Sequence, residues 1–319
     1  MSASIASIPS LQTLQHTKRT SFVGLMRGEL RKIMHLRVTW VVFAVITMLV
    51  LGGQLLLISG PTTSADLRRA PLEMFNNVME GDVAIVRIFS GIFMLILAAH
   101  VVGLEYQYGT IRVLLARGVG RLQLLGAKVM ALTLVGFVVL LVESLIELVF
   151  AWGLTLKLAD GGQPWKALGA EFWADLRVYL FYLALNLVVT MLLAVAASVV
   201  GRSLAFGLAV GLSWFAVDSL LTIPLSLLAR FTHSDFWLKL SGILLGPLLN
   251  RLPDYLAPAY HETVQGPAGP VTRTLHVGGF GPMPLVHVPG GQALAIIGVY
   301  TAIFVTVAVT LAVRREALE

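Results

Sequence analysis

Long apolar stretches alternate with shorter polar segments along most of this chain. A helix needs about 20 mostly apolar residues to cross the hydrocarbon core of a bilayer. The pattern therefore predicts an all-α membrane protein with six transmembrane helices. The six windows are Thr39–Ser59, Ile85–Leu104, Leu124–Thr155, Tyr179–Val200, Leu204–Leu228 and Ala293–Val313.

A different pattern precedes the first window, in the segment "SFVGLMRGELRKIMHLR". Phe22, Met26, Leu30 and Ile33 fall on one helical face, and basic side chains crowd the other. This pattern predicts a cytoplasmic amphipathic helix that lies in the membrane interface, near anionic lipid headgroups. An ordinary basic flank that happens to be helical would look the same. Residues 1–20 are small and polar, so we expect a flexible leader ahead of one transmembrane domain over 21–319.

Composition supports the membrane class, since 57% of the residues are hydrophobic and only 13% are charged. A soluble core of this size could not bury so much apolar surface. Cysteine is absent from the sequence, which excludes disulfides and thiolate metal sites. The seven histidines lack metal-ligand spacing, so no metal site is expected.

The basic residues predict the topology, because cytoplasmic loops carry an excess of Lys and Arg. They place both termini and the segment Gly103–Lys128 on the cytoplasmic side of the cell membrane. The long segment 229–292, rich in Pro and Gly, is expected outside. Apolar residues recur at helical spacing between Phe236 and Leu248, which favours an interfacial or re-entrant helix over a seventh span.

Motifs for enzymatic chemistry are missing from the sequence. It contains no phosphate-binding loop, no His-Glu-x-x-His pair and no Gly-x-Ser-x-Gly elbow. We therefore expect no catalytic site and no directly bound cofactor in this chain, and nothing indicates a nucleic-acid partner.

Ionisable residues inside the predicted spans are candidates for function. Glu143 and Glu147 lie four residues apart, hence on one face of the third span, and should face protein or water rather than lipid. They would form a polar translocation surface or cation site, or a buried pair that fixes helix packing. Asp218 lies near the external end of the fifth span, where a solvated or capped carboxylate is the simpler interpretation.

Two glycines in "GLAVG", Gly207 and Gly211, are candidates for a close helix contact. The contact would lie between two subunits or within one.

The polar segment Gly103–Lys128 carries the most specific pattern. It has an acid at Glu105, a Gly109-Thr110 pair, a Leu114-Leu115 pair, a basic Arg121, and Lys128 at the start of the third span. It resembles the signature loop of ABC-2 type transporter permeases, except that many members have a proline where this chain reads "LLARGVGR". The six spans and the entry helix are also similar to that family.

The residue pattern of this loop also indicates how it could bind a partner. The stretch "TIRVLLARG" predicts a short helix that could press into a groove on a soluble partner, or form a merely solvated basic loop. Gly109 could supply a tight or positive-φ turn, Thr110 could then cap the helix, and Glu105 could reach a basic group on the entry helix or a partner. The apolar face comprises Ile111, Leu114 and Leu115, and the polar handles are Arg112 and Arg117.

The resemblance implies that the partner is a nucleotide-binding ATPase subunit, which would hold ATP and Mg, and that a second permease copy or a homologous permease completes the transporter. It implies an exporter whose coupling residues are those of the loop. An ATP-independent channel, a secondary transporter or a membrane assembly factor remains the alternative, and the sequence does not identify the cargo.

Overall fold

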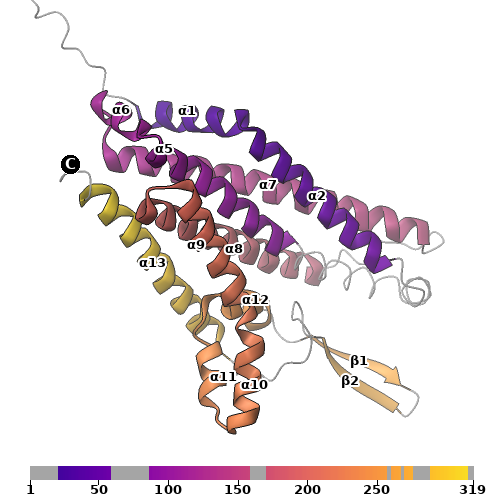
Figure 1. Cartoon of the computed structure of the whole chain (residues 1–319). Helices are drawn as coiled ribbons and strands as arrows, with labels where there is room; N and C mark the ends of the chain where they lie inside the picture. Colours follow the sequence, from indigo (N-terminus) through magenta and orange to yellow (C-terminus); the bar gives the residue numbers. More distant parts are fainter. Residues whose placement is uncertain are drawn as a thin grey trace, which may run out of the picture.

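The structure is a computed structural model that describes residues 21–58, 86–158, 170–256, 260–266, 269–275 and 288–314. The predicted leader at 1–20 lies outside these residues. The described chain is a bundle of helices with one small β-hairpin (Figure 1). Its first half contains α1 (Phe22–His35), α2 (Arg37–Ile58), a helix over 86–98 that continues as the π-helical turn η2 (Ala99–Gly103) and α5 (Leu104–Gln107), α6 (Thr110–Ala116) and α7 (Arg121–Leu158). Its second half contains α8 (Ala170–Gly201), α9 (Leu204–Leu220), α10 (Thr222–Thr232), α11 (Phe236–Ser241), α12 (Leu245–Leu256), β1 (Tyr260–Gly266), β2 (Gly269–Leu275) and α13 (Gly290–Arg314).

Four of the described helices are long and apolar enough to cross a membrane. A fifth is added if α1 and α2, which meet at a bend of 63°, count as one broken span. The bend separates the basic amphipathic residues of α1 from the apolar residues of α2. The expectation of six spans is thus supported for four or five. The four are Val86–Gln107, Arg121–Phe150, Leu176–Gly201 and Gly290–Arg314.

The fifth predicted window, Leu204–Leu228, is not one continuous helix. The helix α9 ends at Leu220 and α10 begins at Thr222. Pro224 accounts for the break, because a proline ring clashes with the carbonyl four residues earlier, here that of Leu220. At 1.5 Å per residue, α9 alone reaches about 25 Å, less than the roughly 30 Å of a bilayer core.

The β-hairpin departs from the all-α expectation. Strands β1 and β2 pair antiparallel, with Thr263 opposite Thr272 and Val264 opposite Val271. Thr and Val favour extended backbone because their branched Cβ restricts helical rotamers. The hairpin falls within the segment 229–292, which the sequence predicts to be a long connection.

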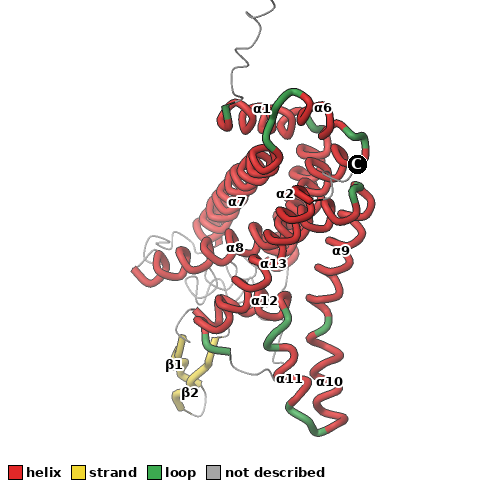
Figure 2. The backbone as a smooth tube through the Cα atoms, turned by 90° about the vertical axis from the view of Figure 1, so that its left-hand side faces the viewer, coloured by secondary structure: helices red, strands yellow, loops and turns green. Residues whose placement is uncertain are grey.

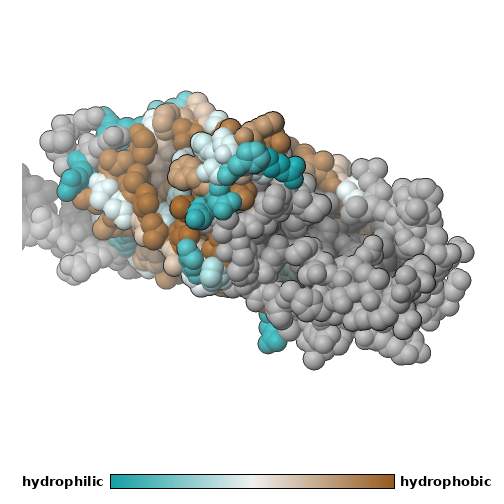
Figure 3. All heavy atoms as spheres, turned by 90° about the horizontal axis from the view of Figure 1, so that it is seen from below, coloured by the Kyte–Doolittle hydropathy of each residue, from teal (hydrophilic) through white to brown (hydrophobic). Residues whose placement is uncertain are grey.

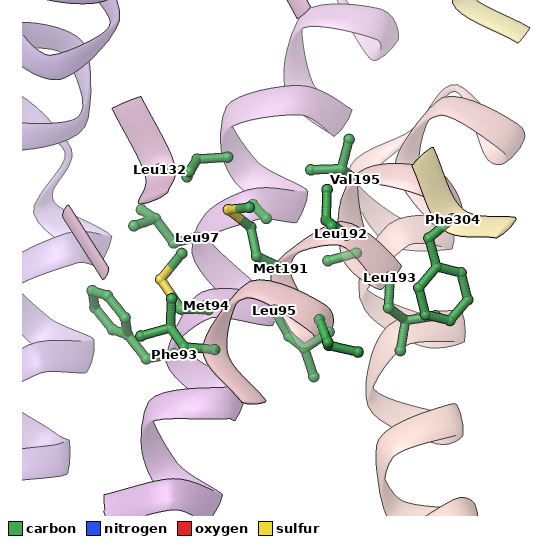
Figure 4. Close-up of a cluster of buried hydrophobic side chains, with 14 of the residues drawn as sticks. Phe93, Met94, Leu95, Leu97, Leu132, Met191, Leu192, Leu193, Val195 and Phe304 are labelled. Atoms are coloured by element: carbon green, nitrogen blue, oxygen red, sulfur yellow. The ribbon is translucent and has the colours of Figure 1, made fainter. Parts of the chain in front are cut away.

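The apolar core lies where the helix over 86–98 meets α7, α8 and α13. Met94, Leu97, Leu132 and Met191 are all almost fully buried there (Figure 4). The outer surface is also largely apolar, and brown side chains cover much of the described face in Figure 3. A bundle that is apolar both inside and outside is what a lipid environment requires.

The two ends of the bundle carry different elements. We call the end with α1, α5 and α6 the loop end, and the end with α10, α11 and α12 the far end (Figures 1 and 2). At the far end, α12 packs against α8, α9 and α13 through Leu245, Leu248, Leu249 and Leu252, which are all buried. The chain therefore turns back against the bundle after α10. The stretch Phe236–Leu248, predicted to be one helix, is divided between α11 and the start of α12.

Candidate functional site

The loop between the helix over 86–107 and α7 begins with a sharp turn. Gly109 has a φ of +66°, a left-handed conformation that glycine adopts without steric penalty. The positive-φ turn predicted from the sequence is therefore confirmed. It redirects the chain so that α6 follows α5 almost at once.

The predicted cap of α6 is wrong. Gly109, not Thr110, is the N-cap residue, and no side chain caps the helix. Thr110 already has helical geometry, and its hydroxyl donates a hydrogen bond of 3.4 Å to the carbonyl oxygen of Glu105. The threonine thus ties α6 back to α5.

A second left-handed glycine ends α6. Gly118 has a φ of +81°, and its N–H donates to the Leu115 carbonyl at 2.9 Å. The N–H of Val119 donates to the Leu114 carbonyl at 3.4 Å, and the two side chains belong to one apolar cluster. These two bonds with an accompanying apolar contact define a Schellman motif. Glycine therefore shapes the second half of this loop, where many ABC-2 permeases have a proline.

The apolar face of α6 packs inside the chain. Ile111 is buried with Val119 and Leu124, while Leu114 and Leu115 are partly buried against the same cluster. The sequence had assigned Ile111, Leu114 and Leu115 to the contact with a partner. These side chains are shielded from water because α6 lies against the start of α7.

The outward face of α6 has a different composition. Arg112, Val113, Ala116 and Arg117 are exposed, and Tyr108 just before the helix is 72% exposed. Val113 is 54% exposed, which makes it the prominent apolar side chain of this face. The outward face thus combines two cationic groups with one aliphatic and one aromatic side chain.

Below α6, four charged side chains of alternating sign form a closed ring. Lys128 of α7 lies 2.9 Å from Glu29 of α1 and 2.7 Å from Glu105 of α5. Lys32 of α1 contacts the other oxygen of Glu105 and lies 3.5 Å from Glu29. We call these four residues the charge ring. Each charge has two neighbours of opposite sign, so the ring joins α1, α5 and α7.

Three members of the charge ring are removed from water. Glu29, Glu105 and Lys128 are 7%, 6% and 2% exposed, whereas Lys32 is exposed at the rim. A buried charge is tolerated only with a partner and hydrogen bonds. The Lys32 side chain is 43% exposed, and the desolvation of its buried part lowers its pKa below the usual range. The charge of Lys128 lowers this pKa further, while Glu29 opposes both effects. The two carboxylates are therefore what allows two ammonium groups to lie so close together.

A backbone group also supports Lys128. Its ammonium donates to the carbonyl oxygen of Val101 at 3.4 Å. Val101 lies in the π-helical turn η2, where the wider turn disturbs the regular hydrogen-bond ladder of the helix. The π-turn therefore lies beside the charge ring.

Arg121, one of the predicted loop residues, reaches the last span. Its guanidinium donates a hydrogen bond of 2.9 Å to the carbonyl oxygen of Val313, in the last turn of α13. Carbonyls in the last turn of a helix lack partners within it, and an arginine satisfies one of them well. The start of α7 is thereby linked to the end of α13.

Sequence reasoning missed three residues of this region. Glu29 and Lys32 were not predicted as partners of the loop, although Glu29 is the one acid in the entry helix and lies three residues from Lys32. The close contact at Gly103 was also missed. A Cβ at this position would come within 2.7 Å of the Leu204 Cα. The lone acid in a basic helix was a usable signal, whereas nothing local identified Gly103.

The intramembrane acids face protein. Glu143 and Glu147 are 0% and 2% exposed, as the sequence predicted, and the hydroxyl of Thr47 on α2 donates to Glu143 at 2.6 Å. The predicted glycines also contact their own chain, because a Cβ at Gly207 would meet Ser198 of α8 and one at Gly211 would meet Leu95. Of the two contacts left open for the glycines, the structure contains the one within the subunit.

The fold and the loop define a class of protein: a helical, multi-pass membrane protein whose polar loop is fastened by charges to its entry helix. A family model described as ABC-2 family transporter protein matches residues 25–218, more than half of the chain. The protein therefore belongs to the ABC-2 transporter family, as the loop sequence indicated. No curated protein gives a significant match.

Proposed function

We propose that this chain is the permease subunit of an ATP-driven exporter and that a separate ATPase subunit binds ATP and Mg. Two permeases, either identical or homologous, would form the path across the cell membrane. Family membership supports a membrane transport role. The observation that carries the coupling proposal is the charge ring, which fastens the loop to the entry helix α1 and to the long helix α7.

The outward face of α6 is the proposed contact with the ATPase subunit. A short helix that presents Val113 between Arg112 and Arg117 suits an apolar groove with acidic edges. Arg is enriched among residues that dominate binding energy at interfaces. The contact differs from the one expected from sequence, since Leu114 and Leu115 support α6 from inside.

The charge ring and Arg121 would transmit movement of α6 into the membrane. Glu105 joins the loop to Lys32 on α1 and to Lys128 on α7. Arg121 extends the connection to α13 through the Val313 carbonyl. Displacement of α6 by the ATPase would therefore move three helices together.

The loop end is proposed to be cytoplasmic, with both termini on that side. Exposed arginines gather there on several elements, as the positive-inside rule requires. The far end, including the β-hairpin, would then be external. Taken together, α9 and α10 reach about 40 Å at 1.5 Å per residue, enough to complete a sixth span across the break at Leu221.

Replacement of the outward face tests the coupling. The double variant Val113→Asp, Arg117→Glu should insert and keep its melting temperature, because neither side chain is buried, yet lose the ATPase subunit on co-purification. The conservative pair Val113→Leu, Arg117→Lys is the matched control and should retain it. Normal co-purification and normal ATP hydrolysis with the first variant would remove α6 as the contact.

A further inference from the structure

A small cavity lies near the far end of the bundle, away from the charge ring. It has a volume of about 20 Å³ and is bounded by the helix over 86–107, α8, α9 and the first turn of α12. Apolar side chains form part of its wall, among them Leu193, Phe215 and Leu249. Trp214, which is 41% exposed, borders it on the outer side.

The rest of the wall is polar and deeply buried. Arg87, Asn186, Thr190 and Asp218 line the cavity and are 5%, 2%, 4% and 6% exposed. They come from three helices, so no local feature of the sequence brings them together. Each of these four buried polar side chains needs hydrogen-bond partners.

The hydrogen bonds among these groups leave capacity for a ligand. The amide of Asn186 donates to the Arg87 carbonyl at 3.3 Å, and the Thr190 hydroxyl donates to the Asn186 carbonyl at 2.8 Å. The hydroxyl oxygen of Thr190 still has acceptor lone pairs. Within the described part of the chain, the hydrogen bond accepted by the Asp218 carboxylate comes from the backbone N–H of Gly246. A carboxylate has about four acceptor sites, so more donors can bind.

Charge and size together limit what can occupy the cavity. A cation would face the guanidinium of Arg87, and an anion would face the carboxylate of Asp218. A neutral ligand that both donates and accepts satisfies both walls. A bound water takes up roughly 10–15 Å³ of a cavity of this kind and needs two to four polar partners. The cavity of about 20 Å³ therefore has room for one water.

We propose that this cavity is a binding site for an ordered internal water that links Asp218 on α9 to the polar groups of α8 and of the helix over 86–107. The Asp218 carboxylate also accepts the N–H of Gly246, so the group that binds the water also holds the first turn of α12. The site belongs to the far end and does not depend on the ATPase or the cargo.

Synchrotron radiolysis with mass spectrometry tests the water directly. Radicals made from a bound water oxidise the side chains beside it, and rapid mixing with ¹⁸O-labelled water times its exchange. Phe215 and Leu249 should be oxidised in the purified wild-type protein, with ¹⁸O appearing more slowly than at Phe231, which is 81% exposed. The buried Phe93 and Leu248, which do not line the cavity, should stay unmodified.

A matched pair of variants distinguishes oxidation by the bound water from oxidation by solvent that enters the protein elsewhere. Thr190→Val removes one polar partner at nearly constant volume and should reduce oxidation of Leu249 several-fold. Thr133→Val removes the same kind of hydroxyl, which bonds the carbonyl four residues earlier, and should change nothing at Leu249. Oxidation of Leu249 no greater than that of Leu248 would show a dry cavity, and exchange as fast as at Phe231 would show bulk access. Either result overturns the proposal, and both are measured on the wild type.

Discussion

The ammonium group of Lys128 lies 2.7 Å from a carboxylate oxygen of Glu105, so the start of α7 is held to the polar loop that precedes it. The same ammonium group binds Glu29 on α1 at 2.9 Å. A single buried cation thus joins three helices, and its removal should affect all three.

Lys128→Met should destabilise the protein strongly. It leaves Glu29 and Glu105 buried and facing each other, and breaking a buried ion pair from one side costs about 3–5 kcal/mol. Lys32→Met should have a smaller effect, because Lys32 is exposed at the rim and its interactions are screened by water. Thermal unfolding of both variants in detergent measures the difference, and equal shifts would contradict the central position of Lys128.

A charge exchange distinguishes a ring from an isolated pair. The double variant Glu29→Lys, Lys128→Glu restores attraction between its two positions. It also places like charges beside Lys32 and Glu105, so the melting temperature should not recover. Full recovery would mean that the Glu29–Lys128 pair acts alone.

Gly103→Ala should destabilise the protein by about 1–3 kcal/mol, as expected for overpacking. The added methyl group would come within 2.7 Å of Leu204 backbone, which cannot rotate away as a side chain can. Gly298→Ala on α13 is the control, because its methyl group would meet nothing within 4 Å. Equal melting temperatures for the two variants would rule out the close approach of η2 and α9.

Gly118→Ala should weaken the end of α6. A residue with a Cβ loses about 1–2 kcal/mol in the left-handed conformation that Gly118 adopts. Gly120→Ala serves as the control, since Gly120 is not among the positive-φ glycines and its methyl group would make only ordinary contacts. Hydrogen exchange of the Gly118 and Val119 region should increase only in the first variant, and unchanged exchange there would argue against the Schellman motif.

Substitution of the intramembrane acids distinguishes a role in transport from a role in packing. Gln at both Glu143 and Glu147 keeps the shape but removes the charge, so stability should be retained while transport falls if these groups act on the cargo or on a proton. Reconstituted vesicles with a substrate panel measure transport. Full transport by this double variant would leave the acids with packing alone.

Single cysteines test the topology on a chain that has none of its own. Thr263→Cys in β1 should react with an impermeant maleimide added outside intact cells. Tyr108→Cys, at a position that is 72% exposed, should react only after the cells are opened. External labelling at position 108 would reverse the proposed orientation.

The sequence by itself determined the membrane class, the approximate helix positions and the family. These properties are local, because an apolar window or a Gly-Thr turn depends only on residues that are neighbours in the sequence. It also left two partners open for Glu105, a basic group on the entry helix or a second protein, and the structure contains the first. The burial of Glu143 and Glu147 was predicted because a charged group in lipid is costly.

Only the tertiary structure decided which side chains meet. Long-range packing closed the charge ring through Glu29 and Lys32 and brought Arg121 to the carbonyl of Val313. It also packed Leu114 and Leu115, both partly buried, against the cluster of Ile111, Val119 and Leu124. The break after Leu220 was missed for a different reason, since an apolar window measures composition and does not register the clash between the Pro224 ring and the carbonyl of Leu220. Contacts between distant segments depend on how whole helices pack, which hydrophobic periodicity does not encode.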